Sequence, residues 1–172
     1  MQLIVGLGNP GKKFKNTPHN VGFETLDLFK KQGEFSAWRE RKKLKAKISE
    51  GKDLILAKPQ TFVNESGRAV KAIIDYYKIA LSDLWVIQDD LDLEIGKLRI
   101  KKNSRSGGHK GIESIIKELK TQNFKRIKIG VGPKPEKMLA KDYVLKKLKK
   151  QKALSTAKKQ AVELLKYELS NS

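Results

Sequence analysis

The side chains of this chain that could do acid–base chemistry at neutral pH include only two histidines. His19 and His109 are the only histidines among 172 residues, and cysteine is absent. Histidine is the side chain whose ionisation lies nearest neutral pH, so an imidazole base must be one of these two. The lack of cysteine excludes disulfides, thiolate metal sites and cysteine nucleophiles. Two histidines also argue against a histidine-rich zinc site.

The segment GLGNPG at 6–11 follows the apolar run at 3–5 and has the spacing of a dinucleotide-binding loop. That motif also needs a helix that begins at the loop and an acidic residue that ends the second strand. The following residues, KKFKNTPHNVG, contain Pro18 and no apolar period, and Asp27 lies in a helical pattern. The sequence therefore predicts no dinucleotide cofactor. Instead, Gly6 and Gly8 would allow a tight turn that presents Asn9 at the carboxyl end of a strand.

Three further polar segments follow predicted strands or precede predicted helices. PQTFVNESG contains Asn64, which either caps the next helix or faces a ligand. IQDDLDL follows the strand at 84–87 and includes Asp89, and SGGHKG at 106–111 precedes a helix whose free N–H groups favour an anion. Each segment also has a purely structural interpretation, as a cap, a solvated turn or a bend. In a sheet covered on both faces, however, these loops would share one end and form one cleft.

The elements that must position these loops alternate between strands and helices. Apolar patterns of strand length occur at 3–5, 54–56, 84–87 and 127–131, the last with one wetter side. Helical periods occur at 23–31, 70–77, 112–119 and 154–165. A hairpin around Gly51 makes the sheet mixed. We therefore predict a single α/β domain over 1–172, with a central mixed, mostly parallel twisted sheet flanked by helices on both faces, and a frayed tail at 170–172.

The charge of the chain points to a polyanionic partner. Lysine and arginine number 38 against 19 acidic residues, a net charge of +19. Such an excess favours nucleic acid, although a solvated lysine-rich surface needs no partner at all. No run approaches the roughly 18 apolar residues of a membrane span, and the basic runs lack the apolar face of an interfacial helix. We expect a cytoplasmic protein that contacts RNA or DNA and no membrane.

Five ordered segments carry a resemblance to a known family. VGLGNPG, FKNTPHNVG, PQTFVNESG, DDLDL and GGHKGIES occur in the order and spacing of the bacterial-type peptidyl-tRNA hydrolases, and the resemblance covers essentially the whole chain. That family has a monomeric α/β fold with a central mixed sheet. The resemblance implies a carboxylic ester hydrolase that cleaves the ester between a peptide and the 3′ end of tRNA, recycling tRNA from aborted translation without metal or cofactor.

The resemblance also implies roles for particular residues. His19 would activate water, and Asp89 would hydrogen-bond its imidazole. Asn9 and Asn64 match the family's paired asparagines, which hold the main chain of the peptide. An amide suits this role because it carries both a donor and an acceptor.

The same resemblance implies contacts to the tRNA. Phe14 and Phe62 match contacts to the terminal adenosine, on which an aromatic ring can stack. The residues that match the family's phosphate-facing positions are Lys101, Arg126 and Lys128. A lid would lie over the cleft near GPKPEKML at 132–139, where two prolines argue against regular structure.

Three positions depart from the family pattern. Pro18 replaces an arginine and pushes Thr17 towards an extended backbone. Phe14 replaces a common tyrosine, so stacking remains without a hydroxyl. Lys110 replaces an asparagine that helps to hold the substrate and the attacking water; a charged lysine can donate to a carbonyl but cannot accept from water. We expect Lys110 to contact substrate, with retained but altered turnover.

Two other functions remain open on the sequence alone. A non-catalytic RNA-binding protein on the same fold is favoured only by Lys110, whereas His19, Asp89, Asn9 and Asn64 together favour the enzyme. A general DNA-binding domain is disfavoured, because no predicted helix is basic along one face with base-reading residues at its start.

Overall fold

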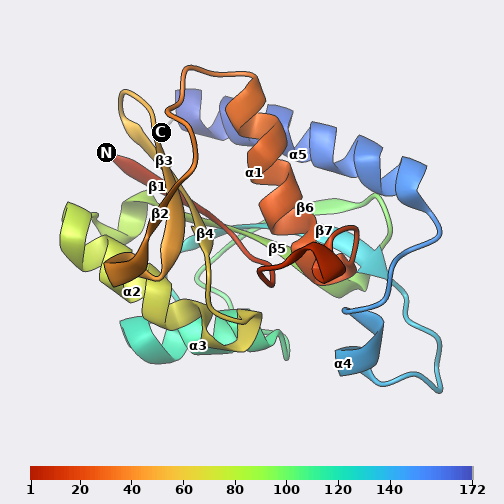
Figure 1. Ribbon diagram of the computed structural model, residues 1–172. Coiled ribbons are helices and arrows are strands. Elements are labelled where there is room, and N and C mark those ends of the chain that lie inside the picture. The colour runs from red at the N-terminus through yellow and green to blue at the C-terminus, as the bar shows by residue number, and fades with distance from the viewer. Residues whose placement is uncertain (172) are drawn as a thin grey trace.

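The computed structural model describes residues 1–171, which form a seven-stranded sheet with helices on both faces (Figure 1). The strands are β1 (Gln2–Gly6), β2 (Arg39–Arg41), β3 (Ala46–Glu50), β4 (Leu54–Pro59), β5 (Leu84–Glu94), β6 (Leu98–Lys102) and β7 (Lys125–Gly132). The helices are α1 (Val21–Lys31), α2 (Ser66–Tyr77), α3 (Lys110–Leu119), α4 (Ala140–Tyr143) and α5 (Gln151–Ser170). No helix in this part of the chain is long and apolar enough to cross a membrane.

The sheet is parallel at its centre and antiparallel at its edges. The strand order is β2-β3-β4-β1-β5-β7-β6. Strand β1 pairs in parallel with β4 and β5, and β5 pairs in parallel with β7. The β2–β3, β3–β4 and β6–β7 pairs are antiparallel. The predicted mixed sheet is confirmed, and the predicted hairpin around Gly51 joins β3 to β4.

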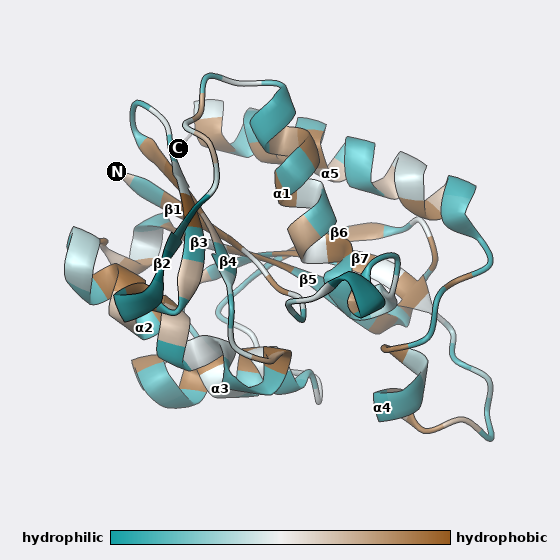
Figure 2. Ribbon diagram, viewed as in Figure 1, coloured by the Kyte–Doolittle hydropathy of each residue, from teal (hydrophilic) through white to brown (hydrophobic). Residues whose placement is uncertain are grey.

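Two apolar clusters hold the helices against the two faces of the sheet. In Figure 1, α1 and α5 lie over one face, and α2 and α3 lie over the other. Val70 and Ile73 of α2 pack with Ile112 and Ile115 of α3 in one cluster, while Leu26 of α1 belongs to the other cluster with the buried face of α5. Figure 2 shows the apolar strands inside and hydrophilic helix faces outside. The predicted helical periods therefore mark the buried faces.

Three elements differ from the prediction. Strand β5 continues through DDLDL to Glu94, so Asp89 lies inside the strand and opposite Ile129 of β7. One side of β7 was predicted to face solvent, and this prediction is wrong at Arg126, which is fully buried. Helix α5 continues to Ser170, beyond the predicted period at 154–165 and into the tail that we expect to fray, while residue 172 lies outside the described residues.

The glycines of GLGNPG permit close packing between the loop and the start of α1. A Cβ atom on Gly6 would lie 2.4 Å from the carbonyl oxygen of Gly22, and one on Gly8 would lie 2.7 Å from Cγ of Phe23. Gly6 and Gly8 are not among the residues with a positive φ. Absence of a side chain, rather than a left-handed turn, is therefore what these two positions require. The main-chain amide of Phe23 can then donate to the carbonyl of Leu7 at 3.2 Å.

Candidate active site

A cavity of about 820 Å³ opens at the carboxyl ends of the parallel strands. Residues from all the polar segments singled out in the sequence line it: Asn9, His19, Asn64, Asp89 and His109. The prediction that these segments form one cleft is confirmed. Their convergence follows from the topology, because parallel neighbouring strands bring their carboxyl ends to the same edge of the sheet.

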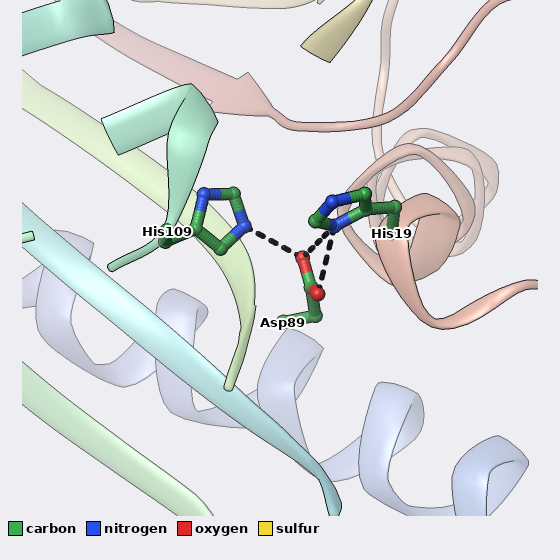
Figure 3. Close-up of side chains that lie close together, drawn as sticks. All are labelled: His19, Asp89 and His109. Atoms are coloured by element: carbon green, nitrogen blue, oxygen red, sulfur yellow. Dashed lines mark hydrogen bonds and ion pairs between the residues drawn. The ribbon is translucent and has the colours of Figure 1, made fainter. Parts of the chain in front are cut away.

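His19 and Asp89 form a buried pair at the base of this cavity (Figure 3). Nδ1 of His19 lies 2.9 Å from Oδ1 and 2.8 Å from Oδ2 of Asp89, and the two residues are only 8% and 1% exposed. His19 lies in the short 3-10 helix Pro18–Asn20 directly before α1, preceded by an extended Thr17 as predicted. Nε2 of His19 has no hydrogen-bond partner among residues 1–171.

Asp89 is an ionised acceptor at neutral pH. Burial alone would raise the pKa of Asp89, but the positive charge and hydrogen bonds supplied by His19 and His109 hold that pKa well below its usual range. A carboxylate can only accept, so the bonded Nδ1 of His19 must carry a proton. Neutral His19 is thereby left with a basic lone pair on Nε2, directed away from its partner.

His109 approaches the same carboxylate from the other side, as Figure 3 shows. Its Nε2 lies 2.7 Å from Oδ1 of Asp89. Its Nδ1 accepts hydrogen bonds from the main-chain amides of Gly111 and Ile112, so the ring caps α3. His109 was not predicted to belong to the site. Two features of the sequence could have indicated it: His109 is one of only two histidines, and it lies in the segment SGGHKG that was expected to line the cleft.

Asn9 is held by its neighbours so that one function of its amide remains free. Asn20 accepts from the Asn9 main-chain amide at 2.8 Å and donates to the Asn9 carbonyl at 3.0 Å. The side-chain Oδ1 of Asn9 accepts from the main-chain amide of Val63 at 2.8 Å. Nδ2 of Asn9 has no partner in the described chain, so this buried residue offers a donor to the cavity. Asn20 is a second residue that the sequence analysis did not assign.

Asn64 and the two phenylalanines lie around the opening of the cavity. Asn64 is exposed in the 3-10 helix Val63–Glu65, and α2 is preceded by Glu65 without a side-chain cap. The alternative role of Asn64 as the helix cap is therefore wrong. Phe14 and Phe62 meet edge to face, with ring centroids 6.3 Å apart and planes at 82°. Phe62 is 57% exposed, which leaves an aromatic surface at the cleft.

Two of the three predicted phosphate contacts have side chains that a phosphate could reach. Lys101 is exposed on the edge strand β6. Lys128 lines the cavity and pairs with Asp90, with 3.2 Å between Nζ and Oδ2. Both lysines could therefore contact an anionic substrate. Lys128 would first have to release Asp90.

Arg126 is not placed to contact a phosphate. Its side chain is fully buried, and it donates to Gln88, to Ser104 and to the carbonyl of Arg105. Burial lowers the pKa of Arg126, with the charge of Asp90 acting in the opposite direction. The expected phosphate contact is therefore wrong for this residue, which instead holds the segment leading to the SGGHKG loop.

Lys110 lies at the mouth of the cavity as the first residue of α3. Its side chain is 69% exposed, and Nζ lies 3.0 Å from Oε2 of Glu113. A short turn of its side chain could bring it to a substrate. The segment expected to form a lid has no helix or strand from 133 to 139, as predicted, and Pro133 and Lys134 line the cavity.

The same His–Asp–His cluster is the one set of side chains within residues 1–171 whose ligand atoms lie close enough to hold a metal, all within 4.8 Å. Each imidazole, however, already donates to the carboxylate, and the remaining nitrogen of His109 caps α3. To bind one metal ion through the nitrogens that now face Asp89, both imidazoles would have to lose these ring protons.

These features define an α/β protein whose cavity holds a buried histidine–carboxylate pair and an amide donor, a set of groups suited to hydrolysis by water. The family model described as peptidyl-tRNA hydrolase matches residues 3–172. The chain belongs to this family of hydrolases, which act on the ester bond of peptidyl-tRNA.

Individual relatives agree with this assignment. The peptidyl-tRNA hydrolase of Lactobacillus helveticus is 48% identical over 134 residues, which cover 76% of this chain and 72% of the relative. That of Sulfurihydrogenibium sp. is 43% identical over 180 residues, covering 100% of this chain and 95% of the relative. The crystal structure of the Acinetobacter baumannii peptidyl-tRNA hydrolase superimposes with a TM-score of 0.90 at 30% identity, covering 96% of this chain and 87% of the other.

Proposed function

We propose that this protein cleaves the ester between a peptide and the 3′ end of tRNA by direct attack of a water molecule that His19 activates, without a metal ion. The observation that carries the mechanism is the geometry of His19: Nδ1 is tied to the ionised Asp89, and Nε2 has no partner among the described residues. A neutral imidazole in this state accepts a proton only through Nε2.

The proposed reaction moves one proton through His19. The water oxygen attacks the ester carbonyl carbon while Nε2 takes a water proton, giving a tetrahedral oxyanion and an imidazolium that Asp89 stabilises. When the bond from this carbon to the ribose oxygen breaks, Nε2 returns the proton to the leaving oxygen. The products are a peptide with a free carboxyl group and a tRNA with a free 3′ hydroxyl, and His19 is again neutral.

Asn9 and Asn64 would recognise different groups of the peptide. Because Oδ1 of Asn9 is already bonded to the Val63 amide, Asn9 can only donate. Its Nδ2 suits a carbonyl oxygen or the developing oxyanion. Asn64 is exposed, with its side-chain amide free to both donate and accept, which suits an N–H and C=O pair of a peptide.

The surface around the cavity suits the tRNA half of the substrate. The edge-to-face pair of Phe14 and Phe62 offers a ring on which the terminal adenosine can stack. Lys101 and Lys128 would contact phosphates, and Lys110 would reach the peptide or the backbone at the cavity mouth. We expect the protein to act as a monomer in the cytoplasm.

The alternative of a non-catalytic RNA-binding protein leaves the central observation unexplained. RNA binding needs positive charge and aromatic surface, both of which lie outside the buried pair. A desolvated carboxylate that orients a histidine towards a cavity has a use in hydrolysis and none in phosphate contact.

The experiment that tests the proposal measures release of free tRNA from N-acetyl-aminoacyl-tRNA in the presence of EDTA. We expect cleavage by the wild type, a loss of at least about 100-fold in His19→Ala, and unchanged tRNA binding by that variant. Lys31→Ala, at an exposed position of α1, serves as the control and should retain full activity. Inactive wild type that still binds tRNA would support the RNA-binding function, and activity lost to EDTA would refute the metal-free mechanism.

A further inference from the structure

Both ring nitrogens of His109 are engaged, each by a different kind of partner. Nε2 lies 2.7 Å from Oδ1 of Asp89. Nδ1 lies 3.1 Å from the main-chain nitrogen of Gly111 and 3.3 Å from that of Ile112. The ring is buried, with 8% of its side chain exposed, so water has little access to replace either partner.

These partners determine where the ring proton lies. A main-chain N–H can only donate, so Nδ1 of His109 must present a lone pair to the first turn of α3. The proton is therefore on Nε2 and is donated to Asp89. His19 uses the opposite tautomer, with its proton on Nδ1 directed at both oxygens of Asp89, 2.9 Å from Oδ1 and 2.8 Å from Oδ2, and Oδ1 also accepts from His109.

We propose that His109 is a positioning residue whose tautomer is set by the amino end of α3, and that its hydrogen bond limits how strongly Asp89 holds the protonated form of His19. The inference rests on the proposed function of His19 as the base. The Asp89 carboxylate accepts from two donors, so it binds the imidazolium of His19 less tightly than a carboxylate with His19 as its one donor would. Return of the proton to the leaving ribose oxygen is thereby favoured.

The other charged groups around this cluster are already paired or lie at its opening. Asp90 of β5 pairs with Lys128 of β7, and Lys110 of α3 pairs with Glu113. The remaining charged side chains that line the cavity are Asp92, Lys134 and Lys141. None is altered by a substitution at position 109, so a change in pH dependence would report on the bond to Asp89.

Two substitutions separate the two contacts of His109. His109→Asn retains an oxygen that can cap α3 but is too short to donate to Asp89. His109→Gln is long enough to present an amide N–H to Asp89 but is a poor cap. We expect the acid limb of kcat/KM against pH to move upward by about half a pH unit in His109→Asn and to return towards the wild-type position in His109→Gln. Because glutamine is the poorer cap, we expect His109→Gln to have a lower Tm than His109→Asn.

The ring tautomer provides a test that does not depend on activity. In protein labelled with ¹⁵N at histidine, we expect the ring signals of His109 to show a protonated Nε2 and an unprotonated Nδ1 at neutral pH. A proton on Nδ1, or an acid limb unchanged in His109→Asn, would overturn the inference. Neither result bears on the proposed role of His19 as the base, which would be refuted only if His19→Ala remained active.

Discussion

At the residue scale, hydrogen bonds within the protein limit what His19 and Asn9 can offer to a substrate. Asp89 accepts from both imidazoles, and the bond to Nδ1 leaves His19 with a lone pair on Nε2, the base of the proposed reaction. The Val63 amide occupies Oδ1 of Asn9, which leaves Nδ2 as a donor. A base and a donor with fixed orientations need little rearrangement when charge develops on the substrate, and this preorganisation lowers the barrier.

The lowered pKa of Asp89 predicts how stability depends on pH. An aspartate in the unfolded chain has a pKa near 3.9, and the native pKa of Asp89 is lower. Its contribution to the free energy of unfolding is therefore fully present above about pH 4 and is lost as pH falls towards the native pKa, by at most about 1.4 kcal/mol per pH unit.

Urea unfolding at pH 5, 4 and 3 measures this effect against Asp89→Asn, which has no proton to gain. We expect the wild type to lose stability more steeply than the variant below about pH 4. Parallel curves for the two proteins would mean that Asp89 has the same pKa in the folded and unfolded chains.

Lys110 provides a prediction about turnover. Lys110→Asn introduces the amide that the family resemblance predicts for this position, and an amide can both donate to the substrate and accept from the attacking water. We expect kcat/KM on N-acetyl-aminoacyl-tRNA to rise by about fivefold, the value of one net hydrogen bond. Glu113→Gln removes the present partner of Lys110 and is the control for loss of that ion pair. Unchanged kinetics in Lys110→Asn would show that this position does not contact the reacting groups.

The sequence was informative for residues whose role is set by their own segment, and less so where a role depends on a distant contact. The segment containing His19 and that containing Asp89 each carried its own signal. The bond from His109 to Asp89 joins residues 20 positions apart across β5 and α3, which no local pattern indicates. The phosphate contact of Arg126 was predicted from the family resemblance, which does not indicate whether a side chain is buried, and here Arg126 donates to Ser104 and to the carbonyl of Arg105.

At the element scale, apolar periodicity predicted the buried strands and all the long helices, because burial produces that pattern. It did not predict β2, which consists of charged residues alone, or β6, in which the apolar alternation is limited to Leu98 and Ile100. It also ended β5 too early, because polar residues from Gln88 to Asp90 continue in the ladder with β7. The polar part of β5 is the part that carries Asp89, so the functional requirement locally overrides the pattern that the core imposes.

The close contact between α1 and the glycine loop predicts the effect of a single methyl group. A Cβ atom on Gly22 would lie 2.5 Å from the carbonyl oxygen of Ile87 and 2.5 Å from the main-chain nitrogen of Leu7. These are backbone atoms of β5 and of the loop after β1, so the helix must shift. We expect Gly22→Ala to lower the free energy of unfolding by about 1–3 kcal/mol, although alanine is the better helix former.

Chemical denaturation compares this variant with Lys31→Ala, an alanine substitution at an exposed position of the same helix. The control should change stability by less than about 0.5 kcal/mol. Equal stability of Gly22→Ala and wild type would show that α1 can move away from the loop without cost. Because Asn20 clamps Asn9 directly before this helix, we also expect Gly22→Ala to reduce activity more than its stability loss alone explains.

At the scale of the whole molecule, a strongly basic chain surrounds one cavity that is lined by the buried pair of His19 and Asp89. The net charge of +19 attracts a polyanion over the whole surface, while only one end of the parallel strands holds the cavity. Under the proposed function, general attraction would bring the tRNA to the protein, and a smaller set of basic contacts would determine its orientation. This division explains why composition alone indicated nucleic acid but could not distinguish tRNA from DNA.

The dependence of tRNA binding on salt tests which lysines contribute to this orientation. Each phosphate contact releases condensed counterions, so removing one lowers the slope of log K against log salt by about 1. Lys101 is exposed on β6, and we expect Lys101→Ala to lower the slope by about that amount. Lys52→Ala is matched in charge, but Lys52 lies in the β3–β4 turn, and three strands separate β4 from β6 in the sheet, so the slope should stay unchanged. Equal effects of the two substitutions would mean that tRNA samples the whole basic surface without one preferred orientation.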